Sequence, residues 1–132
     1  MNNENKIIIY QVFTRLFGNN NNHCVYNGDI VTNGCGKMAD FTLKALSEIK
    51  KLGTTHIWYT GIIEHATQTD YRRYNISPDH PAIVKGKAGS PYAIKDYYDV
   101  DPDLANDIPE RMREFENLVR RTHRAGLNVI ID

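Results

Sequence analysis

The chain has 132 residues, of which 41% are hydrophobic and 24% charged, which is enough for one ordinary domain and excludes a wholly disordered chain. Its 16 basic and 16 acidic residues cancel, so no field of one sign favours nucleic acid or an anionic membrane as a partner. No apolar run approaches the roughly 20 residues of a membrane span, and the polar stretch Met1 to Lys6 does not resemble a signal peptide. We therefore expect a cytoplasmic chain with no nucleic-acid or membrane partner.

The first part of the chain predicts a strand, a loop, a helix and a second strand. A β-branched apolar run predicts a strand over 6–13 that is covered on both faces. The stretch 18–36 is rich in Asn and Gly and is predicted to be a loop. Apolar residues recur at helical spacing over 41–52, and a glycine ends this helix before a short strand over 55–59.

The second part repeats the helix and the strand after a much longer connection. Residues 60–106 show no helical period, and a connection of this length is often functional. A helix is predicted over 107–125, with Asp107 as N-cap and Glu110 completing a capping box. The apolar run 128–131 predicts a third strand with neighbours on both edges, so we expect the chain to be the N-terminal piece of a larger protein.

This alternation of strands and helices predicts an α/β fold with a β-α-β-α-β series and a parallel sheet. The sheet could be half of a doubly wound fold or three strands of a barrel. In both architectures ligands bind at the carboxyl ends of the strands. The candidate site is therefore expected near residues 13–17, 59–62 and Asp132.

The two cysteines, Cys24 and Cys35, both lie in the predicted loop over 18–36. Free thiols and a disulfide between them both remain open from the sequence. His23 precedes Cys24, but no second pair of ligands follows at zinc-binding spacing. No metal site is therefore predicted.

Tyrosines and carboxylates crowd together over residues 89–102. Aromatic rings stack on the apolar faces of sugars, and carboxylates accept hydrogen bonds from sugar hydroxyl groups. The same tyrosines could instead pack this segment onto the rest of the fold, and both interpretations stay open. His65 and His80, in the same long connection, could line a cleft. The acidic loop residues without a motif around them are expected to be solvated: Asp70, Asp79, Asp99, Asp101 and Asp103.

Four segments, in their order along the chain, resemble the α-amylase superfamily of glycoside hydrolases. The segment Ile9–Arg15 looks like the first barrel strand of that family, and Leu46–Trp58 is similar to its first helix and second strand. Pro91–Tyr97 resembles the family segment Gly-Tyr-x-x-x-Asp-Tyr. Ala125–Asp132 looks like the approach to its first signature region, Asp-x-x-x-Asn-His. Together these segments cover most of the chain.

The resemblance implies that residues 1–132 form the N-terminal β-α-β-α-β portion of a TIM (β/α)8 barrel, incomplete in this chain. It implies retaining hydrolysis or transfer at α-glucosidic bonds in α-glucans or maltooligosaccharides. The nucleophile and the acid/base carboxyl group of such an enzyme come from later strands in the family. We therefore expect no catalytic residue in this chain, its partner to be the rest of its own barrel, and the isolated segment to be inactive.

The resemblance also implies which residues meet the substrate. Tyr92 matches the tyrosine that stacks on the sugar beside the scissile bond, and Asp132 matches the first aspartate of the signature region, which supports the site. Asp96 matches a carboxylate that is expected to be structural more often than substrate-binding. Calcium is common in this family and is the one cofactor to consider, but Asp29 is the single carboxylate in the loop 19–33.

A function of a different class fits the same residues. A self-contained α/β module could bind a sugar or a protein with the long connection and carry no catalytic activity. Such a module should unfold cooperatively as a monomer, whereas part of a barrel leaves an open sheet edge that favours aggregation or pairing.

Overall fold

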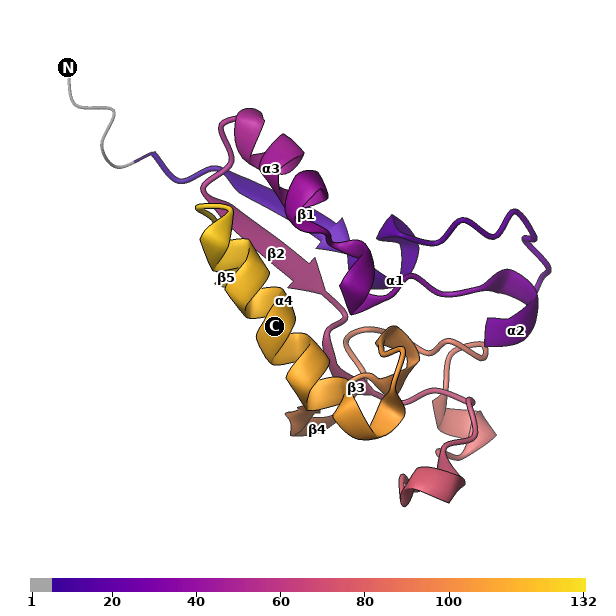
Figure 1. Cartoon of the computed structure of the whole chain (residues 1–132). Helices are drawn as coiled ribbons and strands as arrows, with labels where there is room; N and C mark the ends of the chain where they lie inside the picture. The colour runs from indigo at the N-terminus through magenta and orange to yellow at the C-terminus, as the bar shows by residue number, and fades with distance from the viewer. Residues whose placement is uncertain (1–5) are drawn as a thin grey trace.

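The computed structural model describes residues 6–132 and contains a three-stranded parallel sheet, a two-stranded hairpin and several helices (Figure 1). The strands are β1 (Ile9–Phe13), β2 (His56–Thr60), β3 (Ile63–His65), β4 (Ile94–Val100) and β5 (Asn128–Ile130). The α-helices are α1 (Thr14–Phe17), α2 (Ile30–Asn33), α3 (Leu43–Lys51) and α4 (Arg111–Arg124). Short 3₁₀ turns cover Met38–Asp40, Arg72–Tyr74, Pro81–Ile83, Pro102–Leu104 and Ile108–Glu110.

The sequence also led to expectations about the location of the chain and about membrane-spanning segments. The expected cytoplasmic location rests largely on residues 1–5, which lie outside the described residues, and it stays a prediction. Within residues 6–132, every helix is too short or too polar to cross a bilayer.

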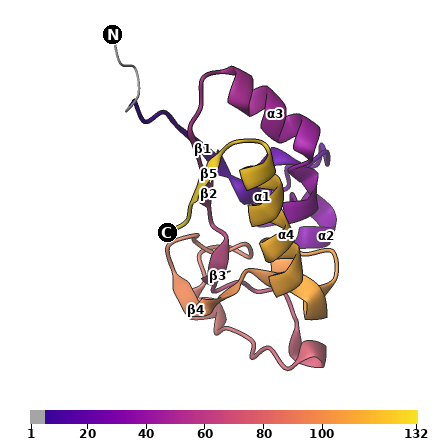
Figure 2. The ribbon, with the colours of Figure 1, turned by 60° about the vertical axis from the view of Figure 1, so that its left-hand side comes forward.

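The parallel sheet has the strand order β1-β2-β5. Residues 9–13 pair with residues 56–60, and residues 56–58 pair with residues 128–130. Helices α3 and α4 both lie on one face of this sheet (Figure 2), as expected when successive crossovers between neighbouring strands have the same hand. The predicted β-α-β-α-β series with a parallel sheet is confirmed.

The described residues cover one face of the sheet, whereas the sequence predicts a first strand covered on both faces. Residues alternate along β1, where Val12 is buried but Ile9 is 50% exposed. In β5, Val129 and Ile130 are half-buried, and Ile131 just after it is exposed. Alternation with a period of two therefore describes β1 better than continuous burial, and β5 is only partly covered by the described residues.

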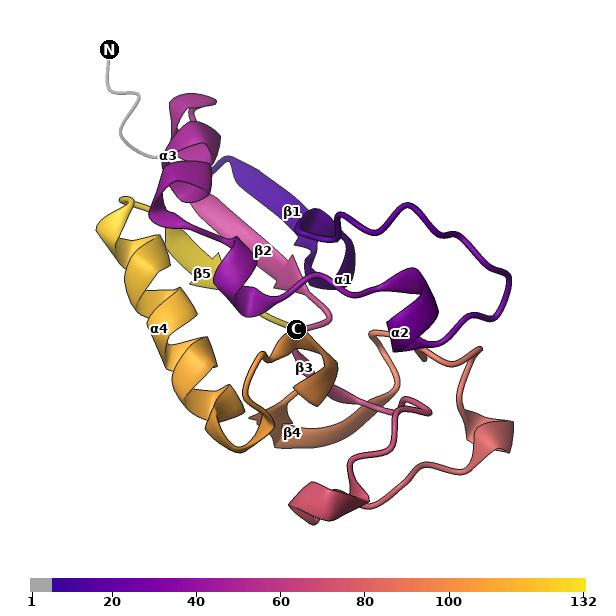
Figure 3. The ribbon, with the colours of Figure 1, turned by 45° about the vertical axis from the view of Figure 1, so that its right-hand side comes forward.

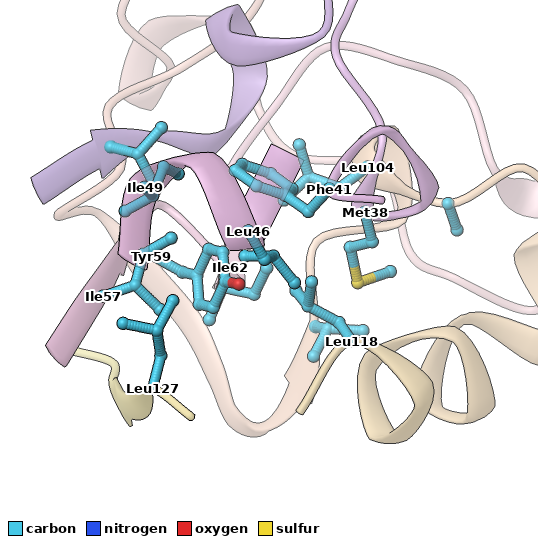
Figure 4. Packing of buried hydrophobic residues seen from close by; sticks show 13 residues of the cluster. Met38, Phe41, Leu46, Ile49, Ile57, Tyr59, Ile62, Leu104, Leu118 and Leu127 are labelled. Atoms are coloured by element: carbon cyan, nitrogen blue, oxygen red, sulfur yellow. The ribbon is translucent and has the colours of Figure 1, made fainter. Parts of the chain in front are cut away.

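The hydrophobic core lies between the sheet and the helices α3 and α4. Its fully buried apolar side chains are Met38, Phe41, Leu46, Ile57, Tyr59, Ile62, Leu104, Leu118 and Leu127 (Figure 4). The hydroxyl group of Tyr59 lies 2.7 Å from Oγ1 of Thr122, and its ring meets Phe41 edge-on with 4.9 Å between the centroids. Burial raises the pKa of Tyr59 to about 12, so this hydroxyl stays protonated.

Helix α4 begins later than the sequence predicts and has a different cap. A 3₁₀ turn precedes it, and the side chain of Asp107 caps neither element. The carboxylate of Glu114 instead accepts hydrogen bonds from the N–H groups of Asn106 and Asp107, at 3.0 and 2.8 Å. The predicted capping box is wrong, because the 3₁₀ turn moves the helix start and brings Glu114 rather than Glu110 back to this end.

The long connection over 60–106 is predicted to lack regular structure but contains the hairpin of β3 and β4. Ile63 lies opposite Val100 and His65 lies opposite Ile94, so one residue lies between the paired ends on β3 and five lie between them on β4. This unequal spacing marks β-bulges, which bend the longer strand. The hairpin lies on the side toward which the carboxyl ends of β1, β2 and β5 point (Figure 3).

Candidate functional site

The segment that connects β3 to β4 packs against the carboxyl ends of the parallel strands at Gly61. Gly61 follows β2 and has a φ of 82°, which favours glycine. A Cβ atom built at this position would lie 3.2 Å from Cβ of Pro91 and 3.3 Å from Cε2 of Phe13. Because Phe13 ends β1, the turn that contains Pro91 is held against the ends of both β1 and β2.

Tyr92 follows Pro91 and presents its ring to solvent at this edge of the sheet. The residue is 64% exposed. Its N–H lies 3.3 Å from Oγ of Ser90, and the N–H of Ala93 donates to the carbonyl oxygen of Ser90 at 3.0 Å. The turn from Ser90 to Ala93 is therefore closed by its own hydrogen bonds, and the exposed ring has a face free to stack on a flat apolar surface.

Asp132 lies at the carboxyl end of the third parallel strand. Its Oδ1 accepts a hydrogen bond from Nε1 of Trp58 at 3.0 Å, and Trp58 stands on β2 opposite Ile130. The structure thus places Asp132 at the same edge of the sheet as the turn that carries Tyr92. Their contact with a substrate stays a prediction.

Asp96 lies on β4, shortly after that turn, and has a local role. Its Oδ1 accepts a hydrogen bond from the N–H of Tyr98 at 2.8 Å, and the residue is exposed. This hydrogen bond within one strand agrees with the structural interpretation of Asp96. A substrate contact by this carboxylate stays a prediction as well.

A buried cluster of charged groups joins the segment after β1 to the segment after β4, and the sequence alone does not predict it. Asp101 and Asp103 are fully buried, so the prediction that they are solvated is wrong. Nη2 of Arg15 donates to Oδ2 of Asp103 at 2.5 Å and lies 3.6 Å from Oδ2 of Asp101. The hydroxyl group of Tyr71 donates to Oδ1 of Asp103 at 2.5 Å, and Nζ of Lys37 donates to its carbonyl oxygen at 2.6 Å.

His65 completes this cluster from β3 and is buried rather than lining an open cleft. Its Nδ1 lies 3.2 Å from the carbonyl oxygen of Ile63, which can only accept, so Nδ1 carries a proton. Its Nε2 lies 3.0 Å from Oδ2 of Asp101, an enclosed oxygen that no donor reaches in hydrogen-bonding geometry.

The electrostatics of the His65 and Asp101 pair favour uncharged forms. Burial, with a further contribution from Asp103, raises the pKa of Asp101 well above its usual range. Burial lowers the pKa of His65. Both groups therefore favour their neutral forms. The guanidinium group of Arg15 is the permanent positive charge that lies close to both Asp101 and Asp103.

One local signal in the sequence could have placed Asp101 correctly. Asp101 and Pro102 form the Asp-Pro start that helical turns favour, and Oδ1 of Asp101 accepts a hydrogen bond from the N–H of Asp103 at 3.0 Å. That signature predicts a cap but not burial. Burial depends on Arg15, which lies 88 residues before Asp103 and could not be paired with it from the sequence.

The two cysteines are free thiols in the structure, so the disulfide that the sequence left open is not formed. Cys24 is exposed and Cys35 is half-buried near Arg15. Burial raises the pKa of Cys35 to about 11, which keeps its thiol protonated and weakly reactive at neutral pH.

The loop 19–33 does not fit a calcium ion, because its side-chain oxygens bond to its own backbone. Oδ1 of Asp29 accepts from the N–H of Thr32 at 2.8 Å. The side-chain oxygens of Asn19, Asn21 and Asn33 likewise accept backbone N–H groups. Across residues 6–132, the His, Cys, Asp and Glu side chains form no group of three that could hold a metal.

A hollow of about 550 Å³ lies between the Asn-rich loop and the long connection. Its lining combines Leu16, Ile30 and Val31 with polar residues that include Asn22, Gln68 and Lys87. Arg15 and Asp103 also contribute to it, but Tyr92 and Asp132 do not. The hollow is therefore distinct from the edge that carries the candidate substrate residues.

The chain is similar to known proteins over nearly all of its length. The family model described as the α-amylase catalytic domain matches residues 11–132. No curated protein matches the chain. Among solved structures, an α-amylase from Lactobacillus plantarum is 28% identical with a TM-score of 0.60, and the match covers 96% of this chain and 22% of that one.

Two further solved structures have the same fold. A noncanonic maltogenic α-amylase, AmyB, from Thermotoga neapolitana is 28% identical with a TM-score of 0.55, over 96% of this chain and 22% of that one. The trehalose-6-phosphate hydrolase of Bacillus licheniformis is 24% identical with a TM-score of 0.58, over 96% of this chain and 16% of that one. At this lower identity the likeness shows the fold alone.

These similarities decide between the two architectures that the sequence left open. The strands and helices correspond to the N-terminal β-α-β-α-β portion of a TIM barrel rather than to half of a doubly wound sheet. The chain spans 22% of the length of the Lactobacillus plantarum enzyme that it matches. With residues 11–132 matched by the family model, the chain belongs to the α-amylase family of glycoside hydrolases.

Proposed function

We propose that this chain is part of an enzyme that hydrolyses or transfers α-glucosidic bonds in α-glucans or maltooligosaccharides. The observation that supports this most directly is the exposed ring of Tyr92 at the carboxyl edge of a sheet that belongs to the α-amylase family. An aromatic ring with a free face suits the apolar C–H face of a glucose unit. Asp132, held by Trp58, supplies a carboxylate at the same edge of the sheet.

In this proposal the reaction proceeds with retention of configuration. It needs a nucleophile and an acid/base carboxyl group roughly 5 Å apart, and in the family both stand on later strands of the barrel. Residues 1–132 then supply loops of the substrate site and no catalytic carboxylate. Asp101 and Asp103 do not change this assignment, because both are fully buried and bonded to protein groups.

The test is the activity of the complete protein on soluble starch and on maltoheptaose, with the anomer of the first product followed by NMR. We expect release of the α-anomer, and we expect Tyr92→Ala to lower kcat/KM about tenfold or more because stacking on the sugar is lost. Tyr26→Ala is the matched control, because Tyr26 is an exposed tyrosine in the Asn-rich loop. Release of the β-anomer, or full activity of Tyr92→Ala, would contradict the proposal.

The second candidate is a self-contained α/β module that binds a sugar or a protein without catalysis. The fully enclosed side chains of the core, with Tyr59 and Phe41 at its centre, favour it. Equilibrium unfolding and sedimentation of residues 1–132 separate the two candidates. A cooperative transition of a monomer supports the module, whereas partial folding or association supports a segment of a larger barrel.

A further inference from the structure

The turn that carries Tyr92 rests at both ends on the same two residues, His65 and Ala66. At its far end, His65 pairs with Ile94, and the N–H of Ala66 donates to the carbonyl oxygen of Ala93 at 3.1 Å. At its near end, Gly89 lies so close that a Cβ atom there would be 1.8 Å from the carbonyl oxygen of Ala66. The same Cβ atom would lie 3.6 Å from Cδ2 of His65.

His65 is in turn held by Asp101, which two other parts of the chain keep in place. Its Nε2 lies 3.0 Å from Oδ2 of Asp101, whose own N–H donates to the carbonyl oxygen of Ile62 at 2.9 Å. Arg15, which follows β1, lies 3.6 Å from the same oxygen of Asp101. The imidazole ring therefore connects Asp101, and through it Arg15 after β1, to the turn from Gly89 to Ala93.

Most of Tyr92 is exposed to solvent, so few side-chain contacts hold its ring. The position of the ring is therefore set mainly by the backbone that carries it. Its backbone is fixed by the turn, and the turn is fixed by His65 and Ala66. A small displacement of a group that contacts substrate can lower the rate by about a hundredfold. A buried residue that never meets the substrate can therefore control the contact.

We propose that His65 is a positioning residue for Tyr92, in which the imidazole packed between Asp101 and the Gly89 turn sets the backbone position from which the tyrosine ring meets a glucose unit. The inference rests on the proposed function for the role of the Tyr92 ring. The effect of His65 on the position of the turn can be measured without substrate. The positioning role of His65 and the proposed function of Tyr92 can therefore be refuted separately.

The first measurement is hydrogen exchange of the backbone amides over residues 89–94 in the complete protein. His65→Leu removes the contact with Asp101 and should speed this exchange about tenfold, whereas His65→Gln keeps a polar group toward Asp101 and should restore most of the protection. His123→Gln is the matched control, because His123 is exposed on α4. Unchanged exchange over 89–94 in His65→Leu would overturn the positioning role.

The second measurement is a double-mutant cycle on kcat/KM for maltoheptaose. With Tyr92 present, His65→Leu should lower kcat/KM about tenfold, and in the Tyr92→Ala background it should change kcat/KM less than about twofold. His65→Gln should restore part of the loss. A residue that only stabilises the fold would give the same loss in both backgrounds, and that result would overturn the inference.

Two further outcomes are decisive. Faster exchange in His65→Leu together with full activity of Tyr92→Ala supports the positioning role and refutes the proposed role of Tyr92. If His65→Leu does not fold, His65→Asn replaces it in both measurements, because its shorter side chain reaches less far toward Asp101. The same coupling to Tyr92 is then expected, and equal losses in both backgrounds would overturn the inference.

Discussion

The two long connections at the carboxyl edge of the sheet are held in place by opposite means. The Asn-rich loop over residues 19–34 is largely exposed and is tied together by side-chain amides that bond to its own backbone. The connection from β2 to α4 is instead held by buried charges, with Arg15 between Asp101 and Asp103. Solvated bonds contribute little each, whereas a buried charge depends on its partner, so the two connections should respond very differently to substitution.

The largest effect is expected from Arg15→Met, which leaves the buried carboxylate of Asp103 without its guanidinium group. Removing one partner of a buried ion pair typically lowers the free energy of unfolding by about 3–5 kcal/mol. Urea denaturation of the wild type and the variant measures the difference. Arg72→Met is the control, because Arg72 pairs with Asp70 at the surface and should leave the urea midpoint unchanged. Equal effects of the two substitutions would remove the distinction between the connections.

A somewhat smaller effect is expected from Gly89→Ala. Gly89 has a φ of 76°, and its new Cβ atom would lie 1.8 Å from a backbone oxygen, so the main chain must move. We expect a loss of about 3 kcal/mol in the free energy of unfolding. Gly86→Ala is the comparison, since Gly86 has a φ of 65° but its nearest atom is 3.7 Å away, and strain alone costs about 1 kcal/mol. A reversed order of the two losses would contradict the close packing at Gly89.

The buried pair of His65 and Asp101 should make stability depend on pH in a characteristic way. Because burial raises the pKa of Asp101, the folded state binds a proton that the unfolded state releases above pH 3.8, and this contribution makes stability fall as pH rises toward the raised pKa. Because burial lowers the pKa of His65, the unfolded state binds the extra proton below pH 6.5, and this contribution makes stability fall as pH drops below 6.5. The two contributions therefore oppose one another below pH 6.5.

Asp101→Asn should remove the contribution of Asp101 and leave that of His65. The stability of the variant should then fall more steeply than that of the wild type as pH drops below 6.5. Urea midpoints of both proteins between about pH 5 and pH 8 measure the effect. Burial also raises the pKa of Glu64, but Glu64 is common to both proteins and its contribution cancels in the difference. Parallel profiles of the two proteins would show that Asp101 does not contribute to the pH dependence.

The smallest effect is expected in the exposed loop. Nδ2 of Asn33 donates to the carbonyl oxygen of Val25 at 2.9 Å, and its Oδ1 accepts the N–H of Val25 at 3.0 Å. Asn33→Ala removes both bonds but leaves the backbone groups open to water, so the free energy of unfolding should fall by about 0.5–1 kcal/mol. Asn33→Asp keeps the acceptor and should lose less. A loss as large as that of Arg15→Met would show that this loop is not held by solvated bonds.

The parallel sheet and its two helices could be predicted from the sequence because their signals are local. Apolar residues of α3 recur at helical spacing, and a glycine with positive φ follows each of α3 and α4. The hairpin of β3 and β4 carries no such signal, because its bulges break the alternation that marks a strand. The expectation that Tyr92 meets a sugar came from the resemblance of its segment to a family pattern, and it stays a prediction.

The sequence indicates the candidate residues at the edge of the sheet but not the buried charged residues that support them. Tyr92 and Asp132 stand in recognisable segments, and both lie at the expected edge of the sheet. Asp101 and Asp103 look like ordinary loop carboxylates, since nothing nearby in the sequence shows that Arg15 will neutralise them. Contacts between residues far apart in the chain decide whether a charge is buried, and a single sequence does not contain them.

The hydrogen bond from Trp58 to Asp132 gives the molecule a built-in optical reporter. Trp58 is the chain's one tryptophan, and its indole N–H is bonded across the sheet to the carboxylate after β5. Separation of β5 from β2 would break that bond and expose the indole to water. The fluorescence emission of residues 1–132 therefore follows the integrity of this edge of the sheet.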